Sequence, residues 1–326
     1  MLTKKKRTIL FWLSIVAFFV LIGPVLIYSS GYRLGPGWSL VKTGGIYIKG
    51  TRSRALITVG GAKKYTTYIS KSALIKNVSP GFHKTTASLE GYFDWEKNLE
   101  VTPGMVTSRE ALLVPKVITG KIIGTTTPEI RTPYLKKNIL YTYDDTGKPK
   151  QLYAGVKKFW FTRGGFLILG TDGEFYKNGE AYQIPENWGD KAKAILEGKK
   201  TSIITEDGAR IVYWDDSGID SYWIYDINKM PQWENPETGQ NGIDRYLHIY
   251  STNKGVRGVE EYPGYQDYLL AEISDGIFVL EIESAGGQNI EPIYRGKTPE
   301  IISVPDASGG ELIIKDGVNY IGLELP

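Results

Sequence analysis

Hydrophobic residues are concentrated in one uncharged block at residues 8–32, directly after four basic residues at positions 4–7. Within it, residues 9–27 contain fourteen Ile, Leu, Phe or Val side chains. Each favours insertion at a helix centre by about 0.3 to 0.6 kcal/mol, which sums to roughly 6 kcal/mol. A helix of about 20 residues covers the roughly 30 Å hydrocarbon core of a bilayer. The pattern therefore predicts a transmembrane helix at residues 8–30, preceded by a tail at residues 1–7.

This block has two interpretations, a retained anchor and a cleaved secretory signal. A signal has an apolar core of about 7 to 15 residues and a small-residue cleavage site. The block is longer, and residues 25–30 contain no Ala-x-Ala pattern, so we favour a retained anchor. Tyr28, Tyr32 and Trp38 suit the aromatic belt of a membrane interface. The basic residues then predict a single-pass protein of the cell membrane, with its N-terminus in the cytoplasm and its C-terminal domains extracytoplasmic.

From Trp38 onward the pattern changes to short alternating or apolar runs bounded by Gly, Pro, Asp and Asn. These runs are typical of strands and turns, and no stretch shows convincing helical periodicity. The pattern predicts an all-β ectodomain. Its first part contains seven strand-like runs, which predict a small sandwich-like domain: residues 45–49, 55–59, 65–69, 74–78, 82–89, 93–101 and 108–114.

The second part, residues 134–326, contains a crude repeat of a hydrophobic strand, an Asp-Gly turn and a second strand. This is a strong local signal for a β-hairpin. The Asp-Gly pairs begin at Asp172, Asp207, Asp275 and Asp316, with gaps of 35, 68 and 41 residues. Units of about 40 residues suggest the blades of a β-propeller. The long middle gap is two units or one unit with a polar insertion at residues 226–245, and we favour the insertion. A sandwich or an incomplete propeller stays open as an alternative.

Three motifs in the first part form the most specific pattern of the chain. They comprise Pro80, Gly81 and His83 before one strand, Gly91, Tyr92 and Trp95 before a second, and Pro103 and Gly104 before a third. Pro and Gly supply the fixed and the permissive φ angles of tight turns. We expect Tyr92 and Trp95 to pin a corner onto the core while their polar tips stay wet. We interpret His83 as a packing or hydrogen-bonding residue.

These motifs resemble the PEGA domain, a small β-sandwich module of prokaryotic surface proteins. The resemblance covers about residues 38–116. The tetrapeptide that names the family, Pro-Glu-Gly-Ala, falls on residues 52–55, where only Ala55 is kept. The resemblance implies a non-catalytic scaffold or binding module in an envelope-attached protein. Residues 117–133, rich in Thr, Gly and Pro, are expected to form a linker or connecting strands.

Charge and composition narrow the classes of partner. The formal net charge is +3, but without the four N-terminal basic residues 35 positive charges face 36 negative ones, so the exported part is close to neutral. A nucleic-acid partner normally requires a basic face, and none is visible. The absence of Cys excludes disulfides, thiolate metal sites and cysteine nucleophiles.

Residues suited to catalysis are few. With only His83 and His248, a zinc site or a Ser-His-Asp triad requires one correctly placed His. Carboxylate pairs occur at residues 144–145, 215–216 and 260–261. Since adjacent residues of a strand point to opposite faces, we interpret the pairs as turns or strand surfaces. Residues 215–220 offer oxygen ligands for calcium but lack the spacing of an EF-hand loop, so a turn is favoured. We therefore expect no catalytic, metal or cofactor site.

Aromatic residues crowd around the inserted loop and are the better functional clue. The candidate ligand contacts are Tyr222, Trp223, Tyr225 and Trp233, of which Trp233 lies within the polar loop. Tyr and Trp are enriched at binding surfaces. Aromatic residues are also favoured in sheets, and we favour packing for most of them, with Trp233 as the best candidate contact.

Two functional hypotheses follow. The first is a non-catalytic, membrane-anchored scaffold or binding module for a protein or an envelope glycan. The alternative is a surface polysaccharide hydrolase that uses a carboxylate pair in the propeller-like domain. A pocket at the repeat axis with two convergent carboxylates would support the hydrolase, because a glycosidase needs its carboxyls about 5 to 9.5 Å apart in one cleft.

Overall fold

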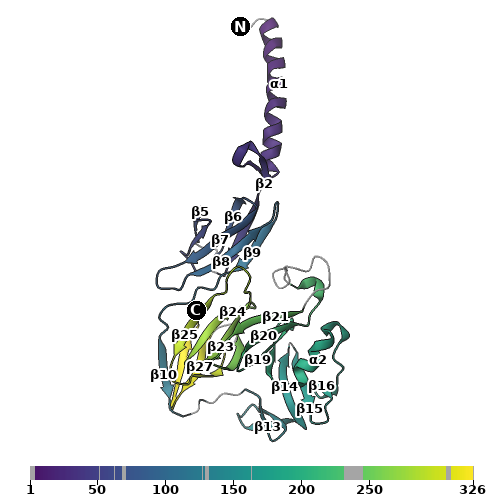
Figure 1. The fold of residues 1–326 in the computed structure, drawn as a ribbon, viewed down its shortest axis with the longest axis vertical. Coiled ribbons are helices and arrows are strands. Elements are labelled where there is room, and N and C mark those ends of the chain that lie inside the picture. Colours follow the sequence, from purple (N-terminus) through teal and green to yellow (C-terminus); the bar gives the residue numbers. More distant parts are fainter. Residues whose placement is uncertain are drawn as a thin grey trace. The chain divides into compact units, whose positions relative to one another are not determined.

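The computed structural model describes residues 4–50, 52–61, 63–67, 71–126, 128, 132–162, 164–230, 245–305 and 310–325. Strands dominate these residues and one long helix lies at the N-terminal end (Figure 1), which confirms the prediction of a β-rich chain behind an apolar helix. The chain forms two compact units. The first comprises Met1–Glu90 and Asp94–Leu113, and the second comprises Gly91–Phe93 and Val114–Pro326.

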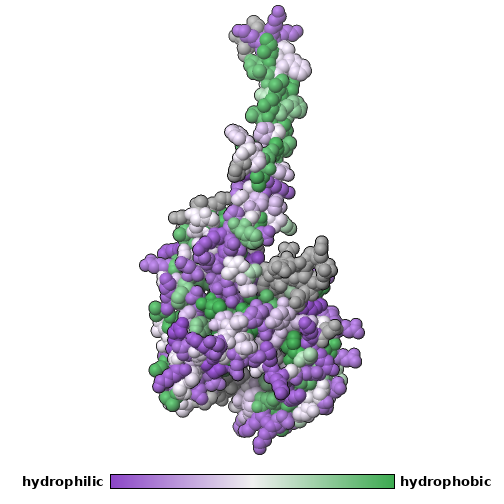
Figure 2. Space-filling view, viewed as in Figure 1, coloured by the Kyte–Doolittle hydropathy of each residue, from purple (hydrophilic) through white to green (hydrophobic). Residues whose placement is uncertain are grey.

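The N-terminal helix, α1 (Lys4–Ser29), has no buried residue among those described. Hydrophobic side chains cover it in Figure 2, with hydrophilic residues at its N-terminal end. A helix that is hydrophobic all round needs an apolar environment on every side, which is provided by a protein core or by lipid. Because α1 is exposed, long and apolar enough to cross a membrane, it fits the predicted anchor.

The first unit contains a short hairpin and two sheets. The hairpin pairs β1 (Tyr32–Leu34) with β2 (Leu40–Lys42) through the turn η1 (Pro36–Trp38). One sheet has the order β6-β3-β9 and the other β5-β4-β7-β8. The seven strands of these sheets are β3 (Gly44–Lys49), β4 (Leu56–Val59), β5 (Lys63–Thr66), β6 (Ala73–Val78), β7 (Gly81–Ser88), β8 (Trp95–Val101) and β9 (Val106–Glu110). Each of the seven strands predicted in this part overlaps one of these strands, although the bounds differ and residues 68 and 69 of the third prediction lie outside the described residues.

Alternation along β8 shows why the first unit forms sheets. Trp95, Lys97, Leu99 and Val101 are buried, whereas the residues between them are exposed. Successive side chains of a strand point to opposite faces, so a period of two gives one buried face. The cost of burying the charged end of Lys97 is offset by its polar interactions.

The described residues of the second unit form five antiparallel sheets. Their orders are β11-β12-β13, β14-β15-β16-β17, β18-β19-β20-β21, β22-β23-β24-β25 and β10-β28-β27-β26. The strands of the first two are β11 (Tyr134–Lys136), β12 (Ile139–Tyr143), β13 (Pro149–Ala154), β14 (Val156–Thr162), β15 (Gly165–Gly170), β16 (Phe175–Lys177) and β17 (Glu180–Ala181). The next two contain β18 (Thr201–Ile204), β19 (Arg210–Asp215), β20 (Gly218–Trp223), β21 (Tyr246–Ser251), β22 (Val256–Glu261), β23 (Tyr268–Ile273), β24 (Gly276–Glu281) and β25 (Ile290–Arg295). The last contains β26 (Glu300–Ser303), β27 (Glu311–Asp316), β28 (Asn319–Glu324) and β10 (Gly120–Gly124).

The strand β10 lies in the segment expected to be a linker or connecting strands. It pairs with β28, so that Gly120 lies opposite Leu323. The last sheet is therefore built from both ends of the second unit.

The four predicted Asp-Gly turns are hairpins, but the prediction that all four are equivalent positions of the repeat was wrong for one of them. Asp172, Asp275 and Asp316 lie in turns between the second and third strands of their sheets, whereas Asp207 joins β18 to β19, the first and second strands. An Asp-Gly pair specifies a tight turn locally and carries no information about which strands of a sheet it joins.

The unequal spacing has a structural cause. The connection from β20 to β21 passes through η3 (Ile227–Lys229) and contains residues 231–244, which lie outside the described residues. No further sheet is formed between β21 and β22, both of which lie wholly within the described range 245–305. This supports one unit with an insertion over two units.

Among the described residues, three apolar cores hold neighbouring sheets of the second unit together, and the smallest joins Leu140 of β12 to Val156 and Ile168 of the next sheet. A second core contains Trp160 and Leu169 from β14 and β15 and Ile211 from β19. A third joins residues of β19 and β20 to residues of β22, β23 and β24. The helix α2 (Asp190–Glu197), which follows η2 (Glu186–Trp188), covers the second core with Ala192 and Leu196. The expectation of no helix beyond Trp38 was therefore wrong here, because two turns are too short for periodicity to be evident.

Candidate functional site

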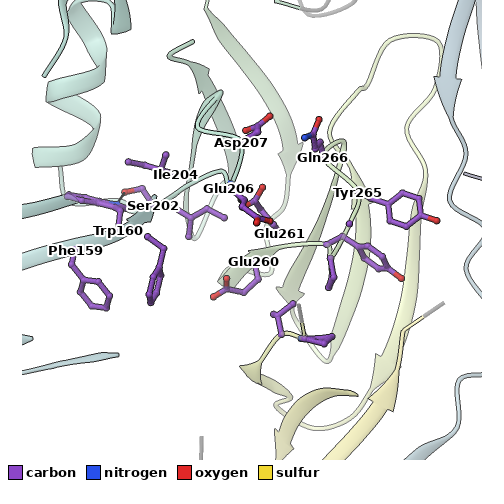
Figure 3. Close-up of a pocket in the computed structure, with 17 residues that line it drawn as sticks. Phe159, Trp160, Ser202, Ile204, Glu206, Asp207, Glu260, Glu261, Tyr265 and Gln266 are labelled. Atoms are coloured by element: carbon purple, nitrogen blue, oxygen red, sulfur yellow. Dashed lines mark hydrogen bonds between the residues drawn. The ribbon is translucent and has the colours of Figure 1, made fainter. Parts of the chain in front are cut away.

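A cavity of about 660 Å³ is lined by residues of four consecutive sheets of the second unit. Three sheets contribute residues from or directly beside their first strands, β14, β18 and β22. The fourth contributes Val304 and Pro305, which directly follow β26, the first of its three consecutive strands. The cavity thus lies where the four first strands approach one another (Figure 3).

One wall of the cavity is aromatic. Phe159 and Phe161 are two residues apart on β14, and their ring centroids lie 5.6 Å apart in an edge-to-face arrangement. The ring of Phe166, on β15, packs against Phe161 at 5.3 Å. Phe161 is 53% exposed although it belongs to this cluster. Beyond β22, Tyr265 packs edge-to-face against Tyr262 at 5.5 Å.

Carboxylates from one turn and one strand end face the same cavity. Glu206 and Asp207 lie in the turn after β18, and Glu260 and Glu261 are the last residues of β22. Figure 3 shows Glu260 and Glu261 projecting in different directions, as expected for neighbours on a strand. Both nevertheless line the cavity. The backbone N–H of Glu206 donates a hydrogen bond of 2.6 Å to Oε2 of Glu261, and this bond connects the turn after β18 to the end of β22.

The surrounding protein makes Glu260 and Glu261 weaker acids than an ordinary glutamate in water. Desolvation raises the pKa of Glu260 to about 7, and the charge of Glu272 adds to the effect. Desolvation also raises the pKa of Glu261 to about 7, and the negative charges of Asp207, Glu206 and Glu260 reinforce it against the Glu206 hydrogen bond. Glu260 is exposed to water inside the cavity, so the desolvation comes from protein that surrounds the cavity rather than from complete burial.

The other carboxylate pairs lie in turns, as interpreted from the sequence. Oδ1 of Asp144 accepts bonds from the backbone N–H groups of Thr146 and Lys148 between β12 and β13. Oδ1 of Asp215 accepts from the N–H and hydroxyl of Ser217 between β19 and β20, and these bonds lower the pKa of Asp215 together with Lys200. Among the residues that the structure describes, no three His, Asp or Glu side chains are placed to hold a metal ion.

The aromatic residues predicted as ligand contacts occupy different environments. Tyr222 and Trp223 are each only 5% exposed and pack within the core, although Tyr222 also lines a small cavity with Tyr213 and Tyr246. The indole N–H of Trp223 donates to the carbonyl of Asp226 at 3.2 Å. Tyr225 is 44% exposed, and Trp233 lies outside the described residues.

The motif residues of the first part occupy turns and core positions. Pro80 directly precedes β7, which begins at Gly81, and Pro103 and Gly104 lie between β8 and β9. Gly81 has a φ of 115° and Gly104 one of 74°, values that favour glycine. Nε2 of His83 lies 2.7 Å from the carbonyl oxygen of Ser79.

The remaining motif residues lie at a corner and in the core. Gly91 has a φ of 83°, and Tyr92 forms an isolated bridge with Pro115. Trp95 is 1% exposed, and its Nε1 is buried without a hydrogen-bond partner among the described residues. The expectation of a wet polar tip was wrong for Trp95, because the inward face of β8 places the whole ring in the core.

The second histidine lies within a Ser-His-Asp arrangement on the edge of a sheet. Nδ1 of His248 is 2.8 Å from Oδ1 of Asp220, and Nε2 is 2.7 Å from the hydroxyl of Ser251. Asp220 also accepts hydrogen bonds from Tyr246 and Lys200. His248 is half exposed, so water is not excluded from the arrangement, and exclusion of water strengthens electrostatic catalysis. We interpret these hydrogen bonds as structural, because they stabilise the pairing of β21 with β20.

Comparison with known proteins gives no family for this chain. No family model matches it and no curated protein matches it. A solved structure of Kluyveromyces lactis Hsv2, "complete loop 6CD", is similar at 13% sequence identity over 71% of this chain and 66% of that chain, with a TM-score of 0.28. A score this low carries no argument about fold or function. The resemblance to the PEGA domain stays a prediction.

Proposed function

We propose that this protein is a single-pass membrane protein that binds an envelope glycan in the cavity of its second unit. The observation that carries the proposal is the cavity itself, which four successive sheets line with aromatic rings and carboxyl groups. The PEGA-like sheets of the first unit then follow the membrane anchor in the chain and precede the binding unit. With this topology the N-terminal tail lies in the cytoplasm, α1 crosses the bilayer, and the sheets of both units lie outside.

A propeller-like arrangement of the second unit is part of the proposal. Consecutive sheets with their first strands around one cavity are the arrangement expected of blades around an axis. The pairing of β10 with β28 supports it, because a strand from the start of the unit completes the sheet formed by its end. The sheet β11-β12-β13 supplies a fifth, smaller blade in this arrangement.

The chemistry of the cavity suits a sugar. Aromatic rings such as Phe161 offer apolar faces for the C–H surface of a pyranose, and carboxyl groups accept or donate hydrogen bonds to hydroxyls. Near neutral pH part of the Glu260 and Glu261 population is protonated, which reduces the negative charge that a neutral ligand meets. The near-neutral exported part also gives no reason to expect a strongly charged ligand.

Hydrolysis of a polysaccharide is the second candidate, and it is favoured by the presence of two carboxyl groups in one cavity. An acid–base couple needs environments that push the two pKa values apart, so that one group is protonated while the other is ionised. Here the surroundings raise both pKa values to about 7. This similarity favours binding over hydrolysis.

The test uses the full chain in lipid nanodiscs and an array of peptidoglycan fragments and capsular oligosaccharides. We expect the protein to retain at least one glycan without releasing reducing ends. Phe161→Ala is expected to weaken retention roughly fivefold, because an aromatic contact is worth about 1 kcal/mol. Val318→Ala, at a position 73% exposed beyond β27, is the matched control and should bind normally.

Two outcomes decide between the candidates. Release of reducing ends that is lost in both Glu260→Gln and Glu261→Gln would establish the hydrolase and overturn the binding proposal. Failure to retain any glycan, with folding intact, would reject the cavity as a glycan site.

A further inference from the structure

The hairpin of β1 and β2 follows directly on α1 and has two different faces. Tyr32 pairs with Lys42, Arg33 with Val41 and Leu34 with Leu40. Alternation places Arg33 and Val41 on one face, and Leu34 and Leu40 on the other, with Tyr32 and Lys42 at the base of that second face. Arg33 and Val41 are half-buried, whereas Leu34 is 65% exposed and Leu40 is 55% exposed.

Arg33 fixes the inner face of the hairpin to α1 and to β6. Its Nη1 donates to the carbonyl of Tyr28 at 2.8 Å, and its guanidinium lies 3.6 Å from the centre of the Tyr28 ring. Its Nη2 donates to Oδ1 of Asn77 at 2.7 Å. Thr43, just beyond β2, donates from both its N–H and its hydroxyl to the carbonyl of Gly31. The hairpin is therefore held at the C-terminal end of α1 (Figure 1).

The tip of the hairpin exposes a tryptophan in a strained conformation. Trp38 is 87% exposed, the highest value among the large exposed hydrophobic residues described. Its φ is 63°, a left-handed conformation that is a genuine outlier for a bulky residue. The backbone N–H of Gly35 closes the turn by donating to the carbonyl of Ser39 at 2.7 Å. The fold thus holds a large apolar ring away from its own core.

We propose that this hairpin is a second membrane contact, in which Trp38, Leu34 and Leu40 enter the interface of the bilayer that α1 crosses. The inference rests on the membrane anchorage in the proposed function and is independent of the glycan. Three observations carry it: the exposed apolar face, its attachment to the end of α1, and the strained exposed ring at the tip.

Lipid is the partner that this surface fits best. Trp favours the headgroup region, where its ring is apolar and its N–H remains hydrated. Of the charged residues of the hairpin, Lys42 is in the pair at its base, and Arg33 is in the next pair and is bonded to the end of α1. Arg33 can therefore remain at the headgroup level while the tip is inserted. A contact at a second point would restrict the tilt of the first unit on the membrane.

Site-directed spin labelling tests the proposal cleanly because the chain has no Cys. The full chain is placed in nanodiscs of phosphatidylcholine and phosphatidylglycerol, and the label is attached after Trp38→Cys or, separately, Leu40→Cys. Collision rates with oxygen and with a water-soluble nickel complex then report depth. Leu13→Cys in α1 marks the hydrocarbon core and Val318→Cys marks water. Phe82→Cys is the matched control, since Phe82 is 68% exposed in the same unit but lies outside the hairpin.

We expect labels at positions 38 and 40 to show a higher oxygen-to-nickel collision ratio than those at positions 82 and 318, and a lower one than that at position 13. Equal ratios at positions 38, 40 and 318 would overturn the inference while leaving the anchor intact. A label at position 13 that behaves as in water would reject the anchorage itself, and the hairpin contact with it. Agreement between positions 38 and 40 guards against a local disturbance at the strained turn.

Discussion

Replacement of Glu261 by Gln should make the second unit less sensitive to pH. The pKa of Glu261 is about 7 in the folded protein, against 4.5 for the ordinary group. One pKa unit corresponds to about 1.4 kcal/mol, so the full shift corresponds to about 3 kcal/mol. Water in the cavity screens part of this effect, and we expect a measured difference of about 1 to 2 kcal/mol.

The sign of the effect follows from proton linkage. Below pH 4.5 the carboxyl is protonated in both the folded and the unfolded chain, so it adds no pH dependence. Between pH 4.5 and about 7 the unfolded chain loses the proton first, and the free energy of unfolding falls as pH rises. Above pH 7 the loss is complete and constant. Gln stays neutral, and its side-chain oxygen can still accept the Glu206 hydrogen bond.

The assay is urea unfolding of the full chain in nanodiscs, followed by tryptophan fluorescence at pH 4 and pH 8. Glu261→Gln should match the unmodified protein at pH 4 and exceed it at pH 8. Glu180→Gln, on the exposed strand β17, controls for the general effect of removing one negative charge. An equal difference at both pH values, or a variant less stable at pH 8, would refute the assignment of a raised pKa to Glu261.

Three further outcomes are expected. Gly218→Ala should destabilise the second unit by about 2 kcal/mol or more, because its Cβ would lie 2.1 Å from the Tyr250 carbonyl oxygen. The control Gly208→Ala, in open space at a φ of 68°, should cost only about 1 kcal/mol. Equal losses of stability in urea unfolding would contradict the steric argument. Leu269→Ala should cost about 2 to 5 kcal/mol in the same assay, since Leu269 is fully buried between two sheets, and a cost below about 1 kcal/mol would be incompatible with that core. A fluorophosphonate probe should not label Ser251, because its network is open to water; labelling that disappears in Ser251→Ala would instead make it a serine nucleophile.

The sequence predicted those features whose signals are local. The uncharged block identified α1, alternation identified the strands of the first unit, and Asp172, Asp275 and Asp316 identified hairpins. Asp207 shows the limit, because a turn signal does not state which strands of a sheet it connects. The short helix α2 was missed because only two of its side chains, Ala192 and Leu196, are fully buried in the core, and two positions are too few to reveal helical periodicity.

The cavity could not be predicted, because it depends on which strands are first in their sheets. Alternation correctly gave Glu260 and Glu261 different directions, yet both line the cavity because they end β22 where the chain turns. From the sequence alone, the excess of aromatic residues was compatible with either ligand contacts or packing within a sheet. Burial separates them: Trp223 is core, whereas Phe161 is exposed at the cavity, and no local pattern distinguishes the two.

The pairing of β10 with β28 imposes an order on folding. Gly120 is synthesised before its partner, Leu323, which lies about 200 residues further along the chain. Contacts between residues so distant in sequence form slowly, because the loop between them must close first. While the chain is incomplete, β10 presents unpaired backbone groups together with the exposed side chains of Ile122 and Ile123. This sheet can therefore be completed only after β28 has been synthesised, and until then β10 offers an unpaired edge for association between nascent copies.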